Sequence, residues 1–249
     1  MSSQVPSVVT AVIASFLFCS DAHANSLKER YEATARGSSG ATTYLEKHDV
    51  TFSSQGKPLT AKADYLRPDG TKIGVIKSNF EKDLSAPEYS FQDLRDGSSH
   101  GLEVRDDAFV LWRKDKDEPR REVSYPKNKF STDALVVGCQ GLHYCLIDNL
   151  DAVKKRGSIP IKYLIPGKLD YYSFTLKFDR EDENYIHLKL RIDSIILRLL
   201  TSSISLKYSK PDRRLISYSG LSNIPDDRGD TQVVTIDYVY KNKKDVATP

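Results

Sequence analysis

The chain has 249 residues, with 39% hydrophobic and 29% charged side chains and a formal net charge of +3. This composition is typical of a water-soluble globular protein, and the length suits one large domain or two small ones. Charges of both signs are interleaved, as between Lys114 and Glu122. This mixing excludes the continuous basic stripe of a nucleic-acid-binding protein.

The first 24 residues have the pattern of a targeting segment. An apolar run of 11 residues from Val8 to Phe18 precedes Ala-His-Ala at positions 22–24, which predicts a cleavable secretory signal peptide. No Lys or Arg precedes the run, and the run is too short to cross a bilayer. Cleavage after position 24 would remove Cys19 and leave residues 25–249 as a single domain. We therefore expect a periplasmic or secreted protein without a further membrane span.

The first half of the mature chain has the alternating pattern of β-strands. Tyr44, Val50 and Phe52 share one face of a predicted strand. Glu46 and His48 interrupt this face with polar side chains. The strand prediction therefore rests on the apolar residues on either side of this polar pair.

A β-hairpin is predicted next. Leu59–Tyr65 alternates apolar and polar residues, Pro-Asp-Gly at 68–70 favours a tight turn, and Ile73–Phe80 forms the returning strand. Shorter strands are predicted at Tyr89–Arg95, Gly101–Arg105, Ala108–Trp112 and Arg121–Tyr125.

One long helical pattern lies within residues 132–169. Its apolar positions recur every three or four residues, at Leu135, Cys139, Leu142, Leu146, Leu150 and Val153. Gly138 and Gly141 would each cost roughly 1 kcal/mol inside a helix. We therefore predict a kink at these glycines and a main helix from about Leu142 to Lys155, which Gly157 ends.

Cys139 and Cys145 are the two cysteines beyond the targeting segment. In a continuous helix their Cα atoms would be about 9 Å apart, whereas a disulfide requires about 7 Å or less. A kink permits the bridge, and an oxidising compartment favours it. We predict a Cys139–Cys145 disulfide that locks the kink; the alternative is two buried thiols on an apolar face.

Strand patterns return after the helix. Ile159–Ile165 alternates, and two further strands have apolar faces made of Tyr172, Phe174, Leu176, Phe178, Ile186, Leu188, Leu190 and Ile192. The segment Ser194–Thr201 fits either a short helix or a strand. The last strands are predicted at Ile204–Tyr208, Leu215–Ser219 and Gln232–Tyr240.

These patterns together predict the fold class. Clean alternation is typical of an antiparallel sheet with one solvated face, and about ten such strands curl instead of staying flat. We predict a mainly β (α+β) fold, in which a large curved antiparallel sheet or half-barrel packs around one principal helix.

No catalytic or metal motif is present. The histidines at 48, 100, 143 and 187 lie singly on different elements, so neither a metal site nor a cofactor is predicted. The nearest string to a hydrolase motif, Gly220–Ile224, lacks the second glycine. Cys145 and His143 are two residues apart and do not face each other on a helix. Arg-Gly-Asp at 228–230 is predicted to be a turn, and no enzymatic activity is expected.

Two segments together resemble a group of exported bacterial proteins of unknown function. They are Asp148–Asp151 with Ile159–Pro166, and Tyr218–Ile224. The predicted architecture is also similar to the curved half-barrels of periplasmic lipoprotein and lipid carriers. The first resemblance implies no activity, and the second concerns architecture alone.

The predicted function follows from export, an amphipathic sheet and the lack of a catalytic motif. The inner face of the curved sheet is expected to be either a filled core or a groove for a ligand. Its residues are Phe174, Leu176, Ile186, Leu188 and Leu190. The first hypothesis is a protein that binds an apolar or lipid-like ligand, or a partner chain, in the curved sheet. The alternative is a structural or interaction protein of the cell envelope without a small-molecule ligand, and the third is an exported hydrolase.

Overall fold

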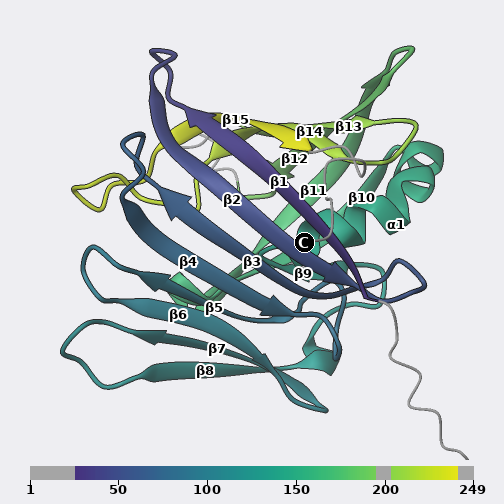
Figure 1. Cartoon of the computed structure of the whole chain (residues 1–249). Helices are drawn as coiled ribbons and strands as arrows, with labels where there is room; N and C mark the ends of the chain where they lie inside the picture. Colours follow the sequence, from purple (N-terminus) through teal and green to yellow (C-terminus); the bar gives the residue numbers. More distant parts are fainter. Residues whose placement is uncertain (1–25, 195–202, 241–249) are drawn as a thin grey trace, which may run out of the picture.

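The computed structural model of the chain describes residues 26–194 and 203–240 (Figure 1). These residues form one sheet of fifteen strands, one α-helix and two short 3-10 helices. The elements are β1 (Leu27–Arg36), β2 (Thr42–Phe52), β3 (Pro58–Leu66), β4 (Lys72–Asn79), β5 (Glu88–Asp93), β6 (Ser99–Val104), β7 (Ala108–Lys114), β8 (Arg121–Pro126), η1 (Lys127–Lys129), β9 (Leu135–Gly138), α1 (Gly141–Arg156), β10 (Ser158–Ile165), η2 (Pro166–Lys168), β11 (Asp170–Glu181), β12 (Tyr185–Ile192), β13 (Ile204–Ser209), β14 (Leu215–Leu221) and β15 (Val233–Tyr240).

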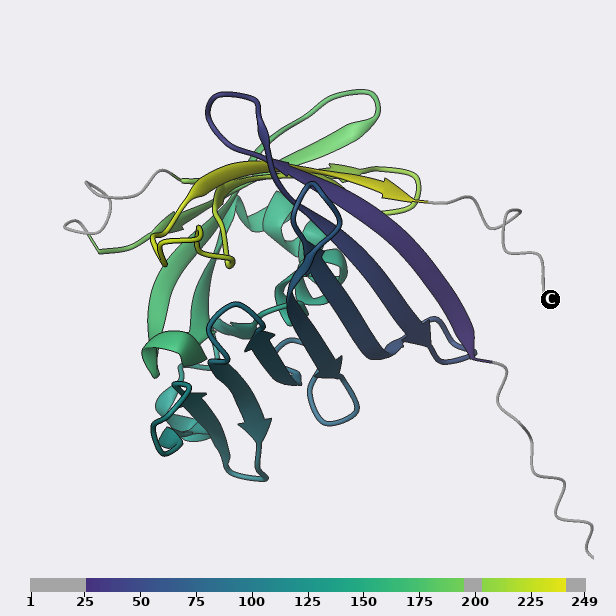
Figure 2. The ribbon, with the colours of Figure 1, turned by 60° about the vertical axis from the view of Figure 1, so that its left-hand side comes forward.

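The strands follow one another around a strongly curved sheet in the order β8-β7-β6-β5-β4-β3-β2-β1-β15-β14-β13-β12-β11-β10-β9. All pairs are antiparallel except β9 with β10. The pairing of β1 with β15 joins an arm of β1–β8 to an arm of β9–β15, and the two arms curl around a common interior (Figures 1 and 2). The predicted fold class, mainly β with a large curved sheet and one principal helix, is confirmed.

The β3–β4 hairpin forms where the sequence predicts it. Gly70 has φ 88°, in the left-handed region that glycine adopts without strain, and the backbone N–H of Thr71 donates to Asp69 Oδ1 at 2.8 Å. β1 was not predicted, because its interior positions are filled partly by the small residues Ala33 and Ala35. The predictions for the targeting segment and for residues 195–201 lie outside the described residues.

The free edges of the two arms meet through a few contacts without a strand ladder. Arg113 Nη1 donates to the carbonyl of Gly167 at 2.9 Å, and the Tyr125 hydroxyl donates to the carbonyl of Leu169 at 3.1 Å. In addition, the N–H of Gly138, at the end of β9, donates to the carbonyl of Ser85, between β4 and β5, at 2.9 Å. The sheet is thereby closed into a barrel-like shape whose seam consists of side chains and turns.

Helix α1 lies on the concave side of the sheet and contacts both arms (Figures 1 and 2). Leu146, Leu150 and Val153 are buried against β10–β13. Tyr144, on another side of the helix, packs with Phe80 of the opposite arm, with ring centroids 5.0 Å apart. The helix ends as predicted at Gly157, whose N–H donates to the Val153 carbonyl at 2.8 Å. The helix therefore fills the interior where the two arms approach each other.

The residues before α1 differ from the prediction. Residues 135–138 form strand β9 instead of a first helical turn, and Cys139 has φ 44°. Cys139 packs against the core cluster formed mainly by strands of the β1–β8 arm, whereas Cys145 lies in the cluster between α1 and β10–β13. Both thiols are free, so the predicted Cys139–Cys145 disulfide is wrong. The residue between β9 and α1 thus places one thiol in one core cluster, and the helix places the other thiol in a second cluster.

Free thiols have a direct chemical test. After unfolding without reductant, we expect iodoacetamide to modify both Cys139 and Cys145, as mapped by peptide mass spectrometry. In the folded protein the reaction should be much slower, because burial raises the pKa of Cys139 to about 12 and also raises the pKa of Cys145. A peptide linked through residues 139 and 145 would contradict the structure, and a sample reduced before unfolding serves as the control.

Candidate functional site

The face predicted to hold a core or a groove lies on β11 and β12. Leu176, Leu188 and Leu190 are at most 1% exposed and pack against the buried leucines of α1. Phe174 and Ile186 are partly buried at the border of the same cluster. The helix fills this face, so these five positions belong to the core in this structure.

A buried polar pair lies on the interior face of β2. Glu46 and His48 are 5% and 8% exposed, and they share this face because residues two apart on a strand point the same way. His48 Nε2 lies 2.7 Å from Glu46 Oε2, where an Nε2–H donates to the carboxylate. His48 Nδ1 is buried and has no hydrogen-bond partner among the described residues.

Tyrosines and alanines from the neighbouring strands flank this pair. Glu46 lies opposite Ala33 of β1 and Tyr65 of β3, as the strand register shows. His48 lies opposite Tyr31 of β1 and Ala63 of β3 in the same register. The Tyr31 ring stacks on the His48 imidazole, with centroids 4.3 Å apart and planes 10° apart. Each polar side chain thus has a large aromatic neighbour on one side and a methyl group on the other.

More phenols gather around the Glu46 carboxylate. Burial first, and then the negative charge of Glu46, raise the pKa of four tyrosines: Tyr44, Tyr65, Tyr218 and Tyr238. The Tyr238 ring lies 6.2 Å from the rings of both Tyr31 and His48. All these hydroxyls are therefore protonated at neutral pH and lie in a region of negative potential.

Several of these polar groups lack a partner within the protein. The Tyr44 hydroxyl is 3.0 Å from Ser222 Oγ, and Tyr218 donates to the Leu221 carbonyl at 2.5 Å. Within the described part of the chain, the hydroxyls of three tyrosines and one carboxylate oxygen make no hydrogen bond; they are those of Tyr31, Tyr65 and Tyr238, and Oε1 of Glu46. We call Glu46, His48, Tyr31, Tyr65 and Tyr238 the interior polar site.

Helix α1 lies beside this site and contributes a second histidine, His143. His143 Nδ1 lies 3.3 Å from the Tyr208 hydroxyl, and the two rings stack with planes 8° apart. Burial, and then the nearby His48 charge, lower the pKa of His143 to about 4. His143 is therefore neutral at pH 7 and adds no positive charge to the interior.

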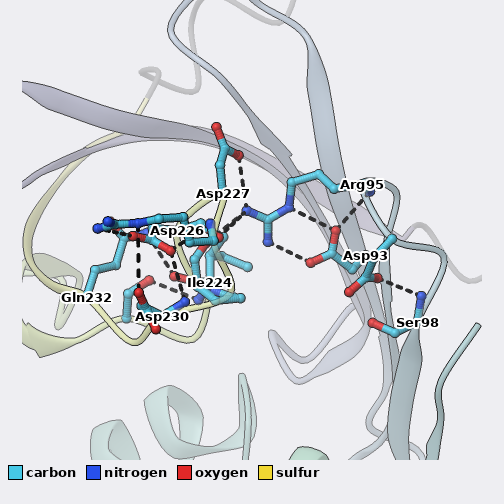
Figure 3. A network of polar contacts seen from close by, with 12 residues as sticks. Asp93, Arg95, Ser98, Ile224, Asp226, Asp227, Asp230 and Gln232 are labelled. Atoms are coloured by element: carbon cyan, nitrogen blue, oxygen red, sulfur yellow. Dashed lines mark hydrogen bonds and ion pairs between the residues drawn. The ribbon is translucent and has the colours of Figure 1, made fainter.

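A loop between β14 and β15, residues 222–232, crosses to the other arm; we call it the strap. Ile224 of the strap is 2% exposed and belongs to the core cluster formed mainly by strands of the β1–β8 arm. Figure 3 shows how Arg95 holds it: Nη1 donates to the carbonyls of Pro225 at 2.9 Å and Asp226 at 3.2 Å. The same guanidinium binds Asp93 through Nε–Oδ1 at 2.9 Å and Nη2–Oδ2 at 2.6 Å. The strap is thereby fixed to the turn between β5 and β6.

The sequence contained a signal for the interior polar site. Glu46 and His48 interrupt an otherwise apolar strand face, and a polar pair at that spacing must either share the interior or break the strand. Its tyrosine neighbours could not be named, because they depend on the register of β1, β3 and β15. No group of three or more His, Cys, Asp or Glu residues suited to a metal ion occurs in residues 26–194 and 203–240. In the same residues, no helix has the length and apolarity needed to cross a membrane.

Comparisons with known proteins found a likeness in structure and none in sequence. No family model matches the sequence, and the search of curated proteins found no match. Among solved structures, the chain is similar to one described as a β-barrel-like protein of domain of unknown function DUF1849 from Brucella abortus. The TM-score is 0.42 and the sequence identity 7%, over 86% of this chain and 97% of that chain.

Proposed function

We propose that this chain is an exported protein that binds an apolar or lipid-like small molecule inside its curved sheet, with the polar head of that molecule at the interior polar site. The observation that carries the proposal is His48 Nδ1, a buried nitrogen without a partner among the described residues. Export rests on the targeting pattern of the first 24 residues and places the protein in the periplasm or outside the cell.

The energetics support a ligand at this position. A buried polar group without a hydrogen bond destabilises a protein by about 1–3 kcal/mol. His48 Nδ1 is such a group, while apolar residues such as Ile76, Phe91 and Ile236 belong to the surrounding cluster. A molecule with an apolar body and a polar head would contact both kinds of surface at once.

The chemistry of the same region favours binding over catalysis. A cysteine nucleophile reacts as the thiolate, and the raised pKa values of Cys139 and Cys145 keep both thiols protonated at neutral pH. The His143 imidazole is stacked on Tyr208 and contacts its hydroxyl. These features support a binding role without turnover.

The alternative function, interaction with another protein through a sheet edge, has less support than ligand binding. β8 ends the sheet, and its residues Arg121–Ser124 are exposed. Arg121 and Glu122 place charges of both signs on this edge, and charged side chains on an edge strand hinder the addition of another strand.

The binding proposal is tested with the fluorescent probe N-phenyl-1-naphthylamine. We expect the purified wild-type protein to enhance the fluorescence of this probe and native mass spectrometry to detect a bound molecule. The double variant Glu46→Leu/His48→Phe should bind the probe at least about tenfold more weakly, because it removes the polar head contacts. Ala33→Leu, which adds bulk directly opposite Glu46 on β1, should also weaken binding.

The control is Lys47→Gln, which changes an exposed residue on the outer face of the same strand. This variant should bind the probe like the wild type. Near-UV circular dichroism establishes that each variant is folded. A wild-type protein that neither binds the probe nor carries a small molecule would overturn the proposal.

A further inference from the structure

A hollow of about 270 Å³ lies on the outer face of the sheet, across β11–β14. We propose that this outer hollow binds the dianionic group of a phosphate monoester. The inference is independent of the proposed function, because that function concerns the interior of the sheet. The polar residues that line the outer hollow are Asp179, Arg180, His187, Lys189, Ser205, Lys207, Ser217 and Ser219.

The alternation of the strands places these residues on the outer face. Strands β11–β14 are neighbours in one arm (Figure 1). Leu188 and Leu206 are buried in the cluster that includes α1. Successive residues of a strand point to opposite faces, so Lys189 and Lys207 point away from the helix.

The register of the strands brings lysines and serines together. Lys189 of β12 lies opposite Ser205 of β13, which lies opposite Ser219 of β14. Lys207 of β13 lies opposite Ser217 of β14. Ammonium groups and hydroxyls from three neighbouring strands therefore gather on one surface, and all of them can donate hydrogen bonds.

The charge of the outer hollow is positive. The Asp179 carboxylate lies 2.8 Å from Lys189 Nζ and 3.3 Å from Arg180 Nη1, so one carboxylate serves two cations. Lys207 has no carboxylate partner among the described residues, and its Nζ lies 4.7 Å from the centre of the Tyr185 ring. Three positive side chains and one negative side chain leave a formal net charge of +2, with histidine counted as neutral.

Several of these groups lack a favourable neighbour within the protein. Lys177 lies directly opposite Lys189, and like charges in that position destabilise a sheet. Ser219 shares its hydroxyl with Thr235, with the two oxygens 3.1 Å apart. The hydroxyls of Ser205 and Ser217 make no hydrogen bond within residues 26–194 and 203–240. An anion in the outer hollow would relieve the repulsion and accept hydrogen bonds from these hydroxyls.

A phosphate monoester matches this set of groups. It carries about −1.5 to −2 charges at neutral pH and has three oxygens that accept hydrogen bonds. Hydrogen bonds from lysine and hydroxyl donors to such an oxyanion are charge-assisted and therefore strong. A carboxylate or a phosphodiester carries one charge and leaves part of the positive charge of the hollow uncompensated.

The other arm has a hollow of similar size and opposite charge. It measures about 340 Å³ and lies across β4–β7. Its charged residues are Lys77, Glu88 and Glu103, which give a formal net charge of −1. This second hollow is an internal control, because a phosphate group should avoid it.

The experiment is a titration of the isotope-labelled protein with glycerol 3-phosphate, followed by heteronuclear NMR at about pH 8, where the monoester is a dianion. We expect the amide signals of Lys189, Ser205 and Lys207 to shift and those of Lys77 and Ser90 to stay in place. Glycerol 3-phosphate should bind at least about tenfold more tightly than dimethyl phosphate at the same ionic strength.

Three variants locate the effect. Lys207→Gln removes the cation that has no carboxylate partner and should weaken binding by about tenfold. Asp179→Asn removes the negative charge of the outer hollow and should tighten binding. Lys77→Gln is the matched control, since Lys77 is an exposed lysine opposite a serine, Ser90, as Lys207 is opposite Ser217. It should leave the affinity within about twofold.

Vesicles distinguish a lipid head group from a soluble phosphate. Phosphatidylcholine vesicles containing phosphatidic acid present a monoester, and those containing phosphatidylglycerol present a diester. Co-sedimentation with the phosphatidic acid vesicles that Lys207→Gln abolishes would assign the monoester to a lipid, whereas binding of glycerol 3-phosphate without co-sedimentation would assign it to a soluble molecule. The proposal is overturned if neither form of monoester binds, if dimethyl phosphate binds as tightly, or if Lys207→Gln and Lys77→Gln weaken binding equally.

Discussion

Replacing Arg95 with alanine is expected to lower the free energy of unfolding by about 3 kcal/mol, the scale for breaking a buried ion pair from one side. Arg95 and Asp93 have side chains only 15% and 6% exposed. Without the guanidinium, the Asp93 carboxylate is left buried with no countercharge, and the strap loses two hydrogen bonds to its backbone. Chemical denaturation of the wild type and the variant measures the difference.

Arg105→Ala is a matched control, because Arg105 also lies two residues after its acidic partner, Glu103. That pair is exposed, with a contact of 3.5 Å, so its loss should change stability by less than about 1 kcal/mol. The double variant Asp93→Asn/Arg95→Ala should recover part of the loss, since it removes the unpaired charge. Equal destabilisation by the single and double variants would show that the two side chains do not act as a pair.

The Arg95 variant has two further signatures. Burial alone would raise the pKa of Asp93, but the hydrogen bonds and charge of Arg95 outweigh it and hold the pKa below its usual value. A depressed carboxyl pKa stabilises the protein above the unfolded pKa, and this stability is lost as the pH falls through the folded pKa. The deficit of Arg95→Ala should therefore shrink in acid. Trypsin should also cleave faster after Arg228, an exposed residue of the strap.

Most of the sheet could be predicted from sequence, because its two-residue period is visible wherever one face is buried and the other solvated. β11 and β12 have that pattern, and their pairing places Leu176 opposite Leu190. β9 has only four residues, and its apolar positions also fit the helical stripe that starts at Leu135. A strand of that length is identified by its partner, and the parallel pairing with β10 is a tertiary contact.

The candidate site shows the same division between local and tertiary information. The pattern on β2 places Glu46 and His48 on one face, and this is local information. Whether such a pair breaks the strand or forms a polar interior depends on the phenols contributed by β1, β3 and β15. The disulfide prediction failed for a related reason, because sequence spacing limits how far apart two thiols lie but does not fix which core cluster each one enters.

Lowering the pH from about 7 to about 4 is expected to reduce the free energy of unfolding by about 4–6 kcal/mol. Two partly buried histidines cause most of this loss. Burial and the Arg113 charge lower the pKa of His100 to about 4, and burial with the His48 charge lowers that of His143 to about 4, from 6.5. Each shift corresponds to at most about 3 kcal/mol, and residual exposure reduces it.

The sign of the effect follows from proton binding. Between pH 6.5 and about 4 the unfolded chain binds protons at these two imidazoles, whereas the folded chain does not. Stability is therefore fully present above the unfolded pKa and falls with pH across this window. Urea denaturation at a series of pH values measures the slope, which should approach two protons near the middle of the window.

Variants assign the slope to these residues. His100→Gln/His143→Gln should flatten the profile across the window, because neither glutamine titrates. His100 is in contact with the aromatic rings of Tyr89 and Phe91, so the double variant will be less stable at neutral pH, and the slope, not the absolute stability, is the readout. His187→Gln, which changes an imidazole paired with Asp182 on the outer face, is the control. A profile that stays flat in the wild type until the carboxylates titrate would contradict the burial of both histidines.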